Sequence, residues 1–237
     1  MTRSRPTLVW FRDDLRLSDH PALHAAAATG GPVVGLYILD EASPARPLGG
    51  AARWWLAQSL RSLQARLQSA GGQLVLRRGK AANAVAEFAG ETDASAVYWN
   101  NIAQTPQRAD AECVKAVLAV AGVASQTFTG DLLAEPESVR NKENRGLRVF
   151  TPFWRRVQSL GDPPAPLPAP KRLPAGPKVA SDALESWQLE PTRPDWARGL
   201  RESWTPGEAA AQMRLKDFLA NVAGYSVERD RPDREGT

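Results

Sequence analysis

The sequence predicts an α/β protein built on a five-stranded, doubly wound, Rossmann-like parallel sheet. Three observations predict this class. Short β-branched or aromatic runs alternate with helical patterns over residues 7–129, several helical patterns end at glycine, and the strand runs are apolar as if covered on both faces. Such alternation implies right-handed crossovers with helices on both faces of the sheet. The first strand should be central, because charged residues gather in the loop after it.

Five short runs carry the strand signal. They are Thr7–Phe11, Pro32–Leu39, Gln73–Arg77, Ala96–Trp99 and Ser125–Phe128. The loop after the first run carries Arg12, Asp13, Asp14 and Arg16, and it leads to a helix for which Asp19 is the expected N-cap. In an open parallel sheet such a loop lies at the carboxyl end of the strands, where ligands bind.

Three further helices are expected between the strands. The second begins near Gly50, the third spans residues 81–89, and the fourth has Thr105 as its cap with Pro106 in its first turn. The apolar positions of the fourth helix give a predicted buried stripe, which comprises Ala109, Cys113, Ala116, Val117 and Val120.

The pattern changes after residue 130. A short helix should follow Thr151 as its cap, and the proline-dense residues 162–177 predict an extended linker rather than a docking motif. Thr205 and Glu208 have the spacing of a capping box at the start of a last helix. The apolar stripe of this helix has no evident cover in the chain, so we expect it to be exposed and the chain to be a piece that ends as a second domain begins. The stripe comprises Ala211, Leu215, Phe218, Leu219 and Val222.

Composition narrows the function classes. The chain of 237 residues has a formal charge of +4 and a pI near 9.5, which is compatible with a nucleic-acid partner without demonstrating one. Cys113 is the only cysteine, and no apolar run is long enough to span a membrane, so we expect a cytoplasmic protein. The two histidines and one cysteine predict no metal site. The absence of glycine between Phe11 and Pro21 argues against an NAD-type dehydrogenase.

Six motifs are distributed over essentially the whole chain. The first is WFRDDLRLSDHPAL at residues 10–23. The others are VGLYILD at 34–40, GAARWWLAQSLRSL at 50–63, VYWN at 97–100, VFTPFW at 149–154 and YSVERDRPDREGT at 225–237. In sequence and in order, these motifs resemble those of the DNA photolyase and cryptochrome family.

This resemblance implies three regions. Residues 1–131 would form an α/β antenna domain, residues 132–204 a connector with a short helix and a proline-rich linker, and residues 205–237 the start of a truncated helical FAD-binding domain. The implied enzyme is a carbon–carbon lyase, a deoxyribodipyrimidine photo-lyase. It would be monomeric and would repair cyclobutane pyrimidine dimers in damaged DNA with light, reduced FAD and an antenna chromophore. The 237 residues alone would be inactive. The alternatives are a cryptochrome-type blue-light receptor and a free-standing flavodoxin-like binding module.

The resemblance also implies site residues, although no catalytic residue falls within this chain. Tyr225 and Thr237 correspond to positions that contact FAD, and Arg229 to a position that contacts the DNA backbone. Without the family, Tyr225 reads as a helix-end aromatic and Arg229 as the partner of a nearby aspartate.

The antenna chromophore is expected in a crevice near Arg12, Arg53 and Asn101. Family members that bind methenyltetrahydrofolate usually carry an Asn-Glu pair where this chain has Pro106-Gln107. A deazaflavin or FMN is therefore favoured over the folate. The alternative reading of Arg53 is an aliphatic stem that covers the sheet. Three tryptophans of the connector should pack it onto its neighbours, and these are Trp187, Trp196 and Trp204.

Overall fold

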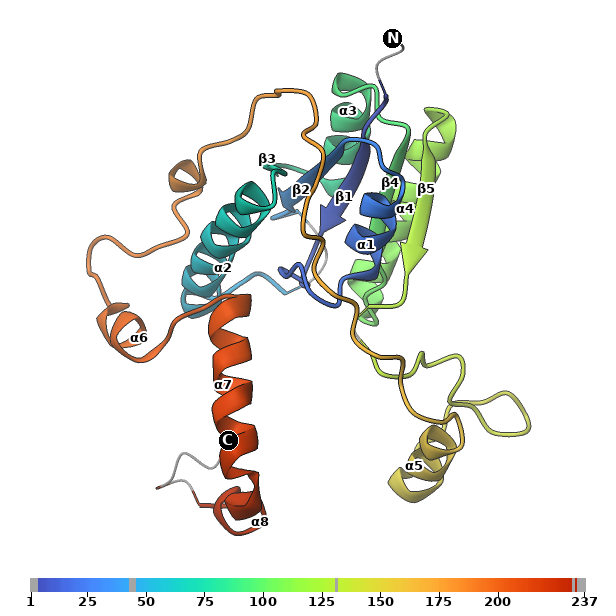
Figure 1. Cartoon of the computed structure of the whole chain (residues 1–237), viewed down its shortest axis with the longest axis vertical. Coiled ribbons are helices and arrows are strands. Elements are labelled where there is room, and N and C mark those ends of the chain that lie inside the picture. Colours follow the sequence, from blue (N-terminus) through green and yellow to red (C-terminus); the bar gives the residue numbers. More distant parts are fainter. Residues whose placement is uncertain (1–3, 43–45, 131, 232, 234–237) are drawn as a thin grey trace.

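A five-stranded, all-parallel sheet forms the centre of the computed structural model, which describes residues 4–42, 46–130, 132–231 and 233 (Figure 1). Its order is β3-β2-β1-β4-β5, so β1 is central as expected. The strands lie within one residue of the predicted runs. Their bounds are β1 Thr7–Phe11, β2 Val33–Leu39, β3 Leu74–Arg78, β4 Ala96–Asn100 and β5 Ala124–Phe128. Thr7 is in register with both Val33 and Ala96, which places the ends of β1, β2 and β4 at one edge.

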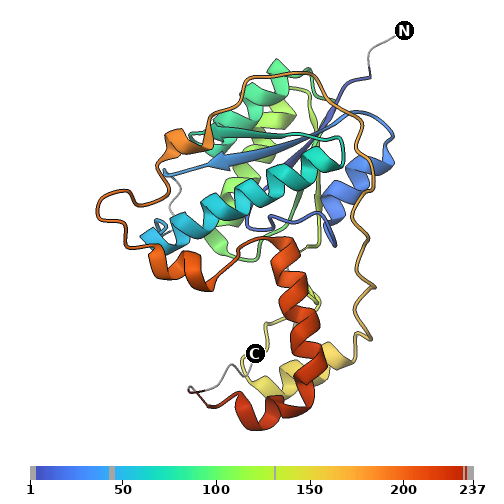
Figure 2. The same cartoon turned by 60° about the vertical axis from the view of Figure 1, so that its left-hand side comes forward.

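Helices cover both faces of the sheet (Figures 1 and 2). Helices α1 (Pro21–Ala28) and α2 (Gly50–Ser69) pack on the face that receives Val9 and Phe11 of β1. Helices α3 (Ala81–Glu91) and α4 (Thr105–Val120) pack on the face that receives Leu8 and Trp10. Because successive side chains of a strand point to opposite faces, β1 contributes to both cores at once.

The predicted buried stripe of α4 is wrong. Ala111, Val114 and Leu118 are buried, whereas Cys113 is exposed and Val120 is 92% exposed. Both sets of residues have helical spacing, so periodicity alone allowed either face. Packing of α4 against α3 and the sheet turns the Ala111 face inward.

Three predicted helix caps are also wrong. His20, not Asp19, caps α1, and its Nδ1 accepts a hydrogen bond from the Leu23 N–H at 3.1 Å. Asp19 instead binds the connector, because its N–H donates to the Leu167 carbonyl at 2.7 Å. Thr105 is the first residue of α4, which has Gln104 at its N-cap, and α5 (Phe150–Gln158) begins before Thr151.

The connector is extended over residues 162–177, as predicted, but it also contributes to the core. Leu173 is buried, and the chain then runs along the edge strand β3, where the Asp182 N–H donates to the Leu76 carbonyl at 3.0 Å. The Ser181 hydroxyl accepts from the Leu76 N–H at 2.9 Å. The segment therefore protects the backbone groups of an edge strand.

The connector contains two more short helices, η1 (Leu184–Trp187) and α6 (Arg198–Ser203), and its tryptophans differ in burial. Trp187 is 1% exposed, with its ring centroid 6.1 Å from that of Tyr37. Trp204 is half exposed and contacts Trp55 edge-on at 5.7 Å. Trp196 is likewise half exposed and lies close to Gly50. Packing of the connector onto α2 and β2 by these rings is thus confirmed.

The last segment, α7 (Glu208–Asn221), η2 (Val222–Gly224) and α8 (Tyr225–Glu228), points away from the sheet (Figures 1 and 2). Leu215, Leu219 and Val222 are about half exposed, as expected of an uncovered stripe, whereas Phe218 of the same stripe is half-buried and contacts Tyr225. The predicted capping box is wrong, because Gly207 is the N-cap and no side chain caps the helix. None of the helices in the described part of the chain is long and apolar enough to cross a membrane.

Candidate functional site

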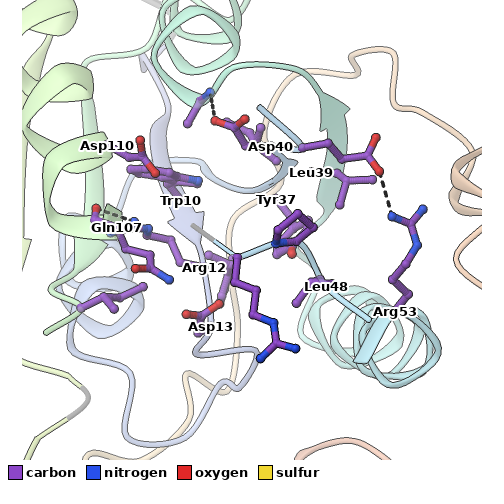
Figure 3. A pocket seen from close by; sticks show the side chains of 17 residues that line it. Trp10, Arg12, Asp13, Tyr37, Leu39, Asp40, Leu48, Arg53, Gln107 and Asp110 are labelled. Atoms are coloured by element: carbon purple, nitrogen blue, oxygen red, sulfur yellow. Dashed lines mark hydrogen bonds and ion pairs between the residues drawn. The ribbon is translucent and has the colours of Figure 1, made fainter. Parts of the chain in front are cut away.

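A crevice of about 220 Å³ opens at the carboxyl ends of β1 and β2, beside the loop that follows β4 (Figure 3). Its walls come from the ends of β1 and β2, from α2, and from the first turns of α3 and α4. Strand order reverses between β1 and β4, so the crevice adjoins the switch point at which open α/β sheets bind ligands.

Arg12 lines this crevice. Its side chain is largely buried, and its guanidinium stands over the Trp10 ring with 4.6 Å between Cζ and the ring centroid. One Nη donates to the Gln107 carbonyl at 2.7 Å, which joins the end of β1 to the first turn of α4. Arg12 therefore holds the crevice walls together as well as lining them.

Arg53 also lines the crevice, from α2. One Nη lies 2.8 Å from Glu41 Oε1, and the hydrogen bond from Arg53 is the main reason that the pKa of Glu41 is lowered. The other Nη donates to the Trp187 carbonyl at 3.5 Å. Arg53 therefore links the crevice wall to the connector, which goes beyond a stem covering the sheet.

Asn101 is not in this crevice. It lines a neighbouring cavity of about 300 Å³ between α4, β5 and residues 132–137, and Arg12 is shared by both. Of the three residues expected near the antenna chromophore, Arg12 and Arg53 therefore line the first crevice and Asn101 lines the neighbouring cavity. The neighbouring Asn100 is the buried one.

A buried polar network that was not predicted from the sequence holds the β1–α1 loop in place. Asp14 Oδ2 lies 3.0 Å from His20 Nε2 and 2.7 Å from Asn100 Nδ2, while Asp14 Oδ1 accepts the Arg12 N–H at 3.0 Å. Burial alone would raise the pKa of Asp14, but these partners lower it to about 2. The helpful sequence signal was the pairing of a loop aspartate with an asparagine at the end of an adjacent strand.

Two other groups at the crevice have raised pKa values. Desolvation raises the pKa of Asp13, against the nearby Arg12 charge. Burial, with the Asp13 charge as a smaller cause, raises the pKa of Tyr37. Asp13 and Tyr37 both border the crevice, so it offers an aromatic hydroxyl that stays protonated and a carboxylate that is not fully hydrated.

Of the residues expected to contact FAD and DNA, two lie together beyond the end of α7. Tyr225 makes an edge-on contact with Phe218, with centroids 5.5 Å apart, and the Arg229 guanidinium lies 5.8 Å from the Tyr225 centroid. Arg229 Nε lies 3.6 Å from Asp230 Oδ2, and both side chains are exposed. Thr237 lies outside the described residues. No group of three His, Cys, Asp or Glu side chains within the described residues could hold a metal ion.

The family profile described as DNA photolyase matches residues 7–171. The chain belongs to the DNA photolyase family. A deoxyribodipyrimidine photo-lyase from Agrobacterium fabrum is 42% identical over 99% of the chain and 49% of its own length. Cryptochrome-1 from Arabidopsis thaliana is 33% identical over 98% of the chain and 34% of its own length.

A solved photolyase structure extends this family relationship to three dimensions. A bacterial class III photolyase from Agrobacterium tumefaciens superposes on this photolyase-family chain with a TM-score of 0.93 and 42% identity, over 100% of the chain and 49% of that structure. The chain thus spans about half the length of this relative and about half that of the Agrobacterium fabrum photo-lyase.

Proposed function

We propose that this chain is the N-terminal portion of a deoxyribodipyrimidine photo-lyase that repairs cyclobutane pyrimidine dimers with light. The observation that carries this is the 42% identity to such an enzyme along 99% of the chain. Reduced FAD, when bound in the complete protein, supplies the photoexcited electron that opens the cyclobutane ring and then returns. Residues 1–131 serve as the antenna domain, 132–204 as the connector and 205–237 as the start of the FAD-binding domain.

The test is a repair assay on the complete gene product that contains these residues. Dimer-containing DNA should lose its dimers under blue light and keep them in the dark. The 237-residue chain with added FAD should repair none. Repair by the 237 residues alone would overturn the expected inactivity. Stoichiometric FAD binding by the complete protein without any repair would favour the alternative, a cryptochrome-type light receptor. The 33% identity to a cryptochrome supports that alternative.

The crevice is the proposed site of the antenna chromophore. Trp10 and Tyr37 supply flat aromatic walls, and Arg12 and Arg53 supply positive charge. Gln107 borders the crevice, and its Oε1 is buried without a hydrogen-bond partner among the described residues, so it suits a ring N–H of a ligand. We favour a deazaflavin or FMN over methenyltetrahydrofolate, since Pro106-Gln107 supplies no carboxylate for a pterin.

An absorption spectrum of the complete protein, with mass analysis of the released chromophore, tests this choice. A flavin or deazaflavin supports it, and a recovered folate overturns it. Arg53→Ala should lower the chromophore content severalfold. Arg77→Ala is the matched control, because Arg77 pairs with Glu91 away from the crevice. Equal loss in both variants would argue against the crevice.

Tyr225 and Thr237 are proposed to contact FAD, and Arg229 to contact the phosphates of damaged DNA. Support for Arg229 is its exposure and its long contact with exposed Asp230, which a phosphate could replace. In the complete protein, Arg229→Ala should weaken DNA binding and reduce the salt slope by about 1 without changing FAD content. An unchanged slope would contradict the assignment.

The complete protein is proposed to be cytoplasmic and monomeric. Sedimentation would test the monomeric state.

A further inference from the structure

Glu208, the first residue of α7, is buried although it begins an exposed helix. Its side chain is 6% exposed, whereas none of the residues of α7 counts as buried as a whole. A carboxylate in such a position needs partners, because loss of water disfavours its charge. The partners do not belong to α7 alone.

Glu208 is held by the β1–α1 loop and by α2. Its Oε2 accepts the Leu17 N–H at 2.8 Å and lies 3.3 Å from Arg66 Nε of α2. Its Oε1 accepts the Ser18 N–H at 2.9 Å and also the Ser18 hydroxyl. Gln212, one turn further along α7, donates to Oε1 at 3.2 Å and to the Ser18 hydroxyl at 3.0 Å. Charge-assisted bonds of this kind are stronger than neutral ones.

The loop that receives Glu208 is itself firmly held. Leu17 is buried, and Asp14 below it is bound to His20 and Asn100. On the other side, Asp19 binds Leu167 of the connector. The same loop begins at Arg12, which lines the crevice, so one stretch of backbone joins the crevice to the start of α7.

Little else fixes the direction of α7. Gly207, just before the helix, has φ +117° and lies so close to Ser62 that a Cβ there would be 2.3 Å from the Ser62 hydroxyl oxygen. Beyond this approach, the Glu208 and Gln212 contacts and the Arg214 guanidinium 5.9 Å from the centroid of the Trp204 ring, α7 runs into solvent (Figure 2). All of these contacts lie in the first half of the helix, and Glu208 is the buried one among them, so α7 should swing more freely if its carboxylate were removed.

We propose that Glu208 is a positioning residue that anchors α7 to the β1–α1 loop and so fixes the helical segment relative to the crevice. Building on the proposed function, this anchor sets the separation and orientation of the antenna chromophore in the crevice and the flavin held by the helical segment. Energy transfer between two chromophores depends on both quantities.

The test uses the 237-residue chain without any chromophore. Cys113 is exposed on α4 and takes one dye, and a Lys216→Cys variant takes the other on exposed α7. The labelled chain with Glu208 intact should give a narrow distribution of inter-dye distances, and the labelled Glu208→Ala variant a broad one. The rate of hydrogen exchange at the Leu17 and Ser18 amides should rise at least about tenfold in Glu208→Ala, because both amides lose an ionised acceptor.

Two further variants make the result specific. Glu208→Gln keeps one acceptor oxygen and should give an intermediate distance distribution, and it serves equally if Glu208→Ala does not fold. Glu202→Ala is the matched control, because Glu202 pairs with Arg198 of its own helix α6. Hydrogen exchange of the β2 amides should stay unchanged in all of them.

An inter-dye distribution that is equally narrow in Glu208→Ala and Glu202→Ala would overturn the proposal, as would unchanged exchange at Leu17 and Ser18. These outcomes concern the anchor alone, because no chromophore is present. In the complete protein, Glu208→Ala should reduce antenna-to-flavin energy transfer while both chromophores remain bound. Loss of a chromophore, or its absence from the unaltered protein, would instead count against the proposed function.

Discussion

Asp14 is the residue on which the β1–α1 loop depends. It is almost fully buried, and although burial alone would raise its pKa, the His20 Nε2 that lies 3.0 Å from Oδ2 and the hydrogen bonds from the Arg12 N–H and Asn100 lower it. The network joins three segments, since Asn100 comes from β4 and its Oδ1 also accepts the Ala22 N–H at 3.0 Å. Leaving a buried donor without its acceptor costs about 1–3 kcal/mol, and Asp14 is the acceptor for more than one buried donor.

We therefore expect Asp14→Ala to lower the free energy of unfolding at neutral pH by about 3 kcal/mol. Asp13→Ala, the adjacent control, should change it little, because desolvation and the neighbouring Asp14 disfavour the Asp13 charge. Urea unfolding followed by circular dichroism measures both. Equal effects of the two substitutions would contradict the assigned network.

The pH dependence follows from the same residue. Since its pKa falls from 3.8 to about 2 on folding, Asp14 stabilises the fold above its ordinary pKa, and this stabilisation, about 2 kcal/mol, is lost as the pH falls toward 2. The fall in stability between pH 4 and 2 should be smaller in Asp14→Ala, although not abolished, because Glu208 and Glu41 also have lowered pKa values. Unfolding curves at a series of pH values test this, and an unaltered acid limb would refute it.

At the scale of elements, α4 shows how packing selects one of two apolar faces. Its composition offers two stripes with helical spacing, and only the one containing Val114 and Leu118 meets α3 and the sheet. The energetic difference between the two faces should be large, because a buried leucine leaves a cavity on truncation while an exposed valine leaves none.

Leu118→Ala should therefore lower the free energy of unfolding by about 2–5 kcal/mol. Val120→Ala removes an apolar side chain from the same helix two residues away, and it should change stability by less than about 0.5 kcal/mol. Denaturant titrations with a shared m-value compare them. A larger loss for Val120→Ala would mean that the exposed face is the packed one.

The connector segment around Trp187 acts as a structural part of the α/β unit. Trp187 is fully buried between the sheet and the connector, its Nε1 donates to Asp182 at 3.0 Å, and its carbonyl accepts from Arg53. The proline-rich residues 162–177 precede this ring, which packs on the same face of the sheet as α2. The linker is therefore extended without being independent of the domain.

Trp187→Ala should cost about 3–5 kcal/mol and expose the connector to limited proteolysis near residues 180–190. Trp196→Ala is the matched control, because Trp196 is half exposed in the same connector and its loss should have a smaller effect than that of buried Trp187. Proteolysis time courses followed by mass spectrometry measure the effect. Equal protection of residues 180–190 in both variants would show that Trp187 does not hold the connector in place.

At the scale of the whole molecule, three regions meet at the β1–α1 loop. The crevice begins at Arg12, the connector binds Asp19, and α7 binds Leu17 and Ser18 through Glu208. The surface of α7 beyond that junction carries half-exposed apolar side chains, which favour association with other surfaces.

The 237-residue chain should therefore self-associate at high concentration through α7. A Leu215→Glu/Leu219→Glu double variant should reduce that association without changing the unfolding transition of the sheet, because both side chains are exposed. Lys216→Glu alters charge on the same helix and serves as the control. Sedimentation over a concentration series measures this, and equal behaviour of the two variants would place the contact elsewhere.

The sequence by itself determined the strands to within one residue, the central place of β1 and the uncovered stripe of α7. The strands β1 and β2 are apolar runs that are buried on both faces, so local pattern suffices for them, whereas the edge strand β5 is largely exposed, contrary to expectation. It also determined the family, because the motifs are long and keep their order.

Only the tertiary structure decided which face of α4 is buried, which residue caps α1, and that Asn101 lines a neighbouring cavity while Asn100 is buried. It also showed that Glu208, expected to be part of a capping box, accepts a hydrogen bond from Leu17, 191 residues away in the sequence. The physical reason is common to all four. A helix-spaced stripe or a hydrogen-bonding side chain has several local solutions of similar free energy, and contacts with segments distant in the sequence select among them.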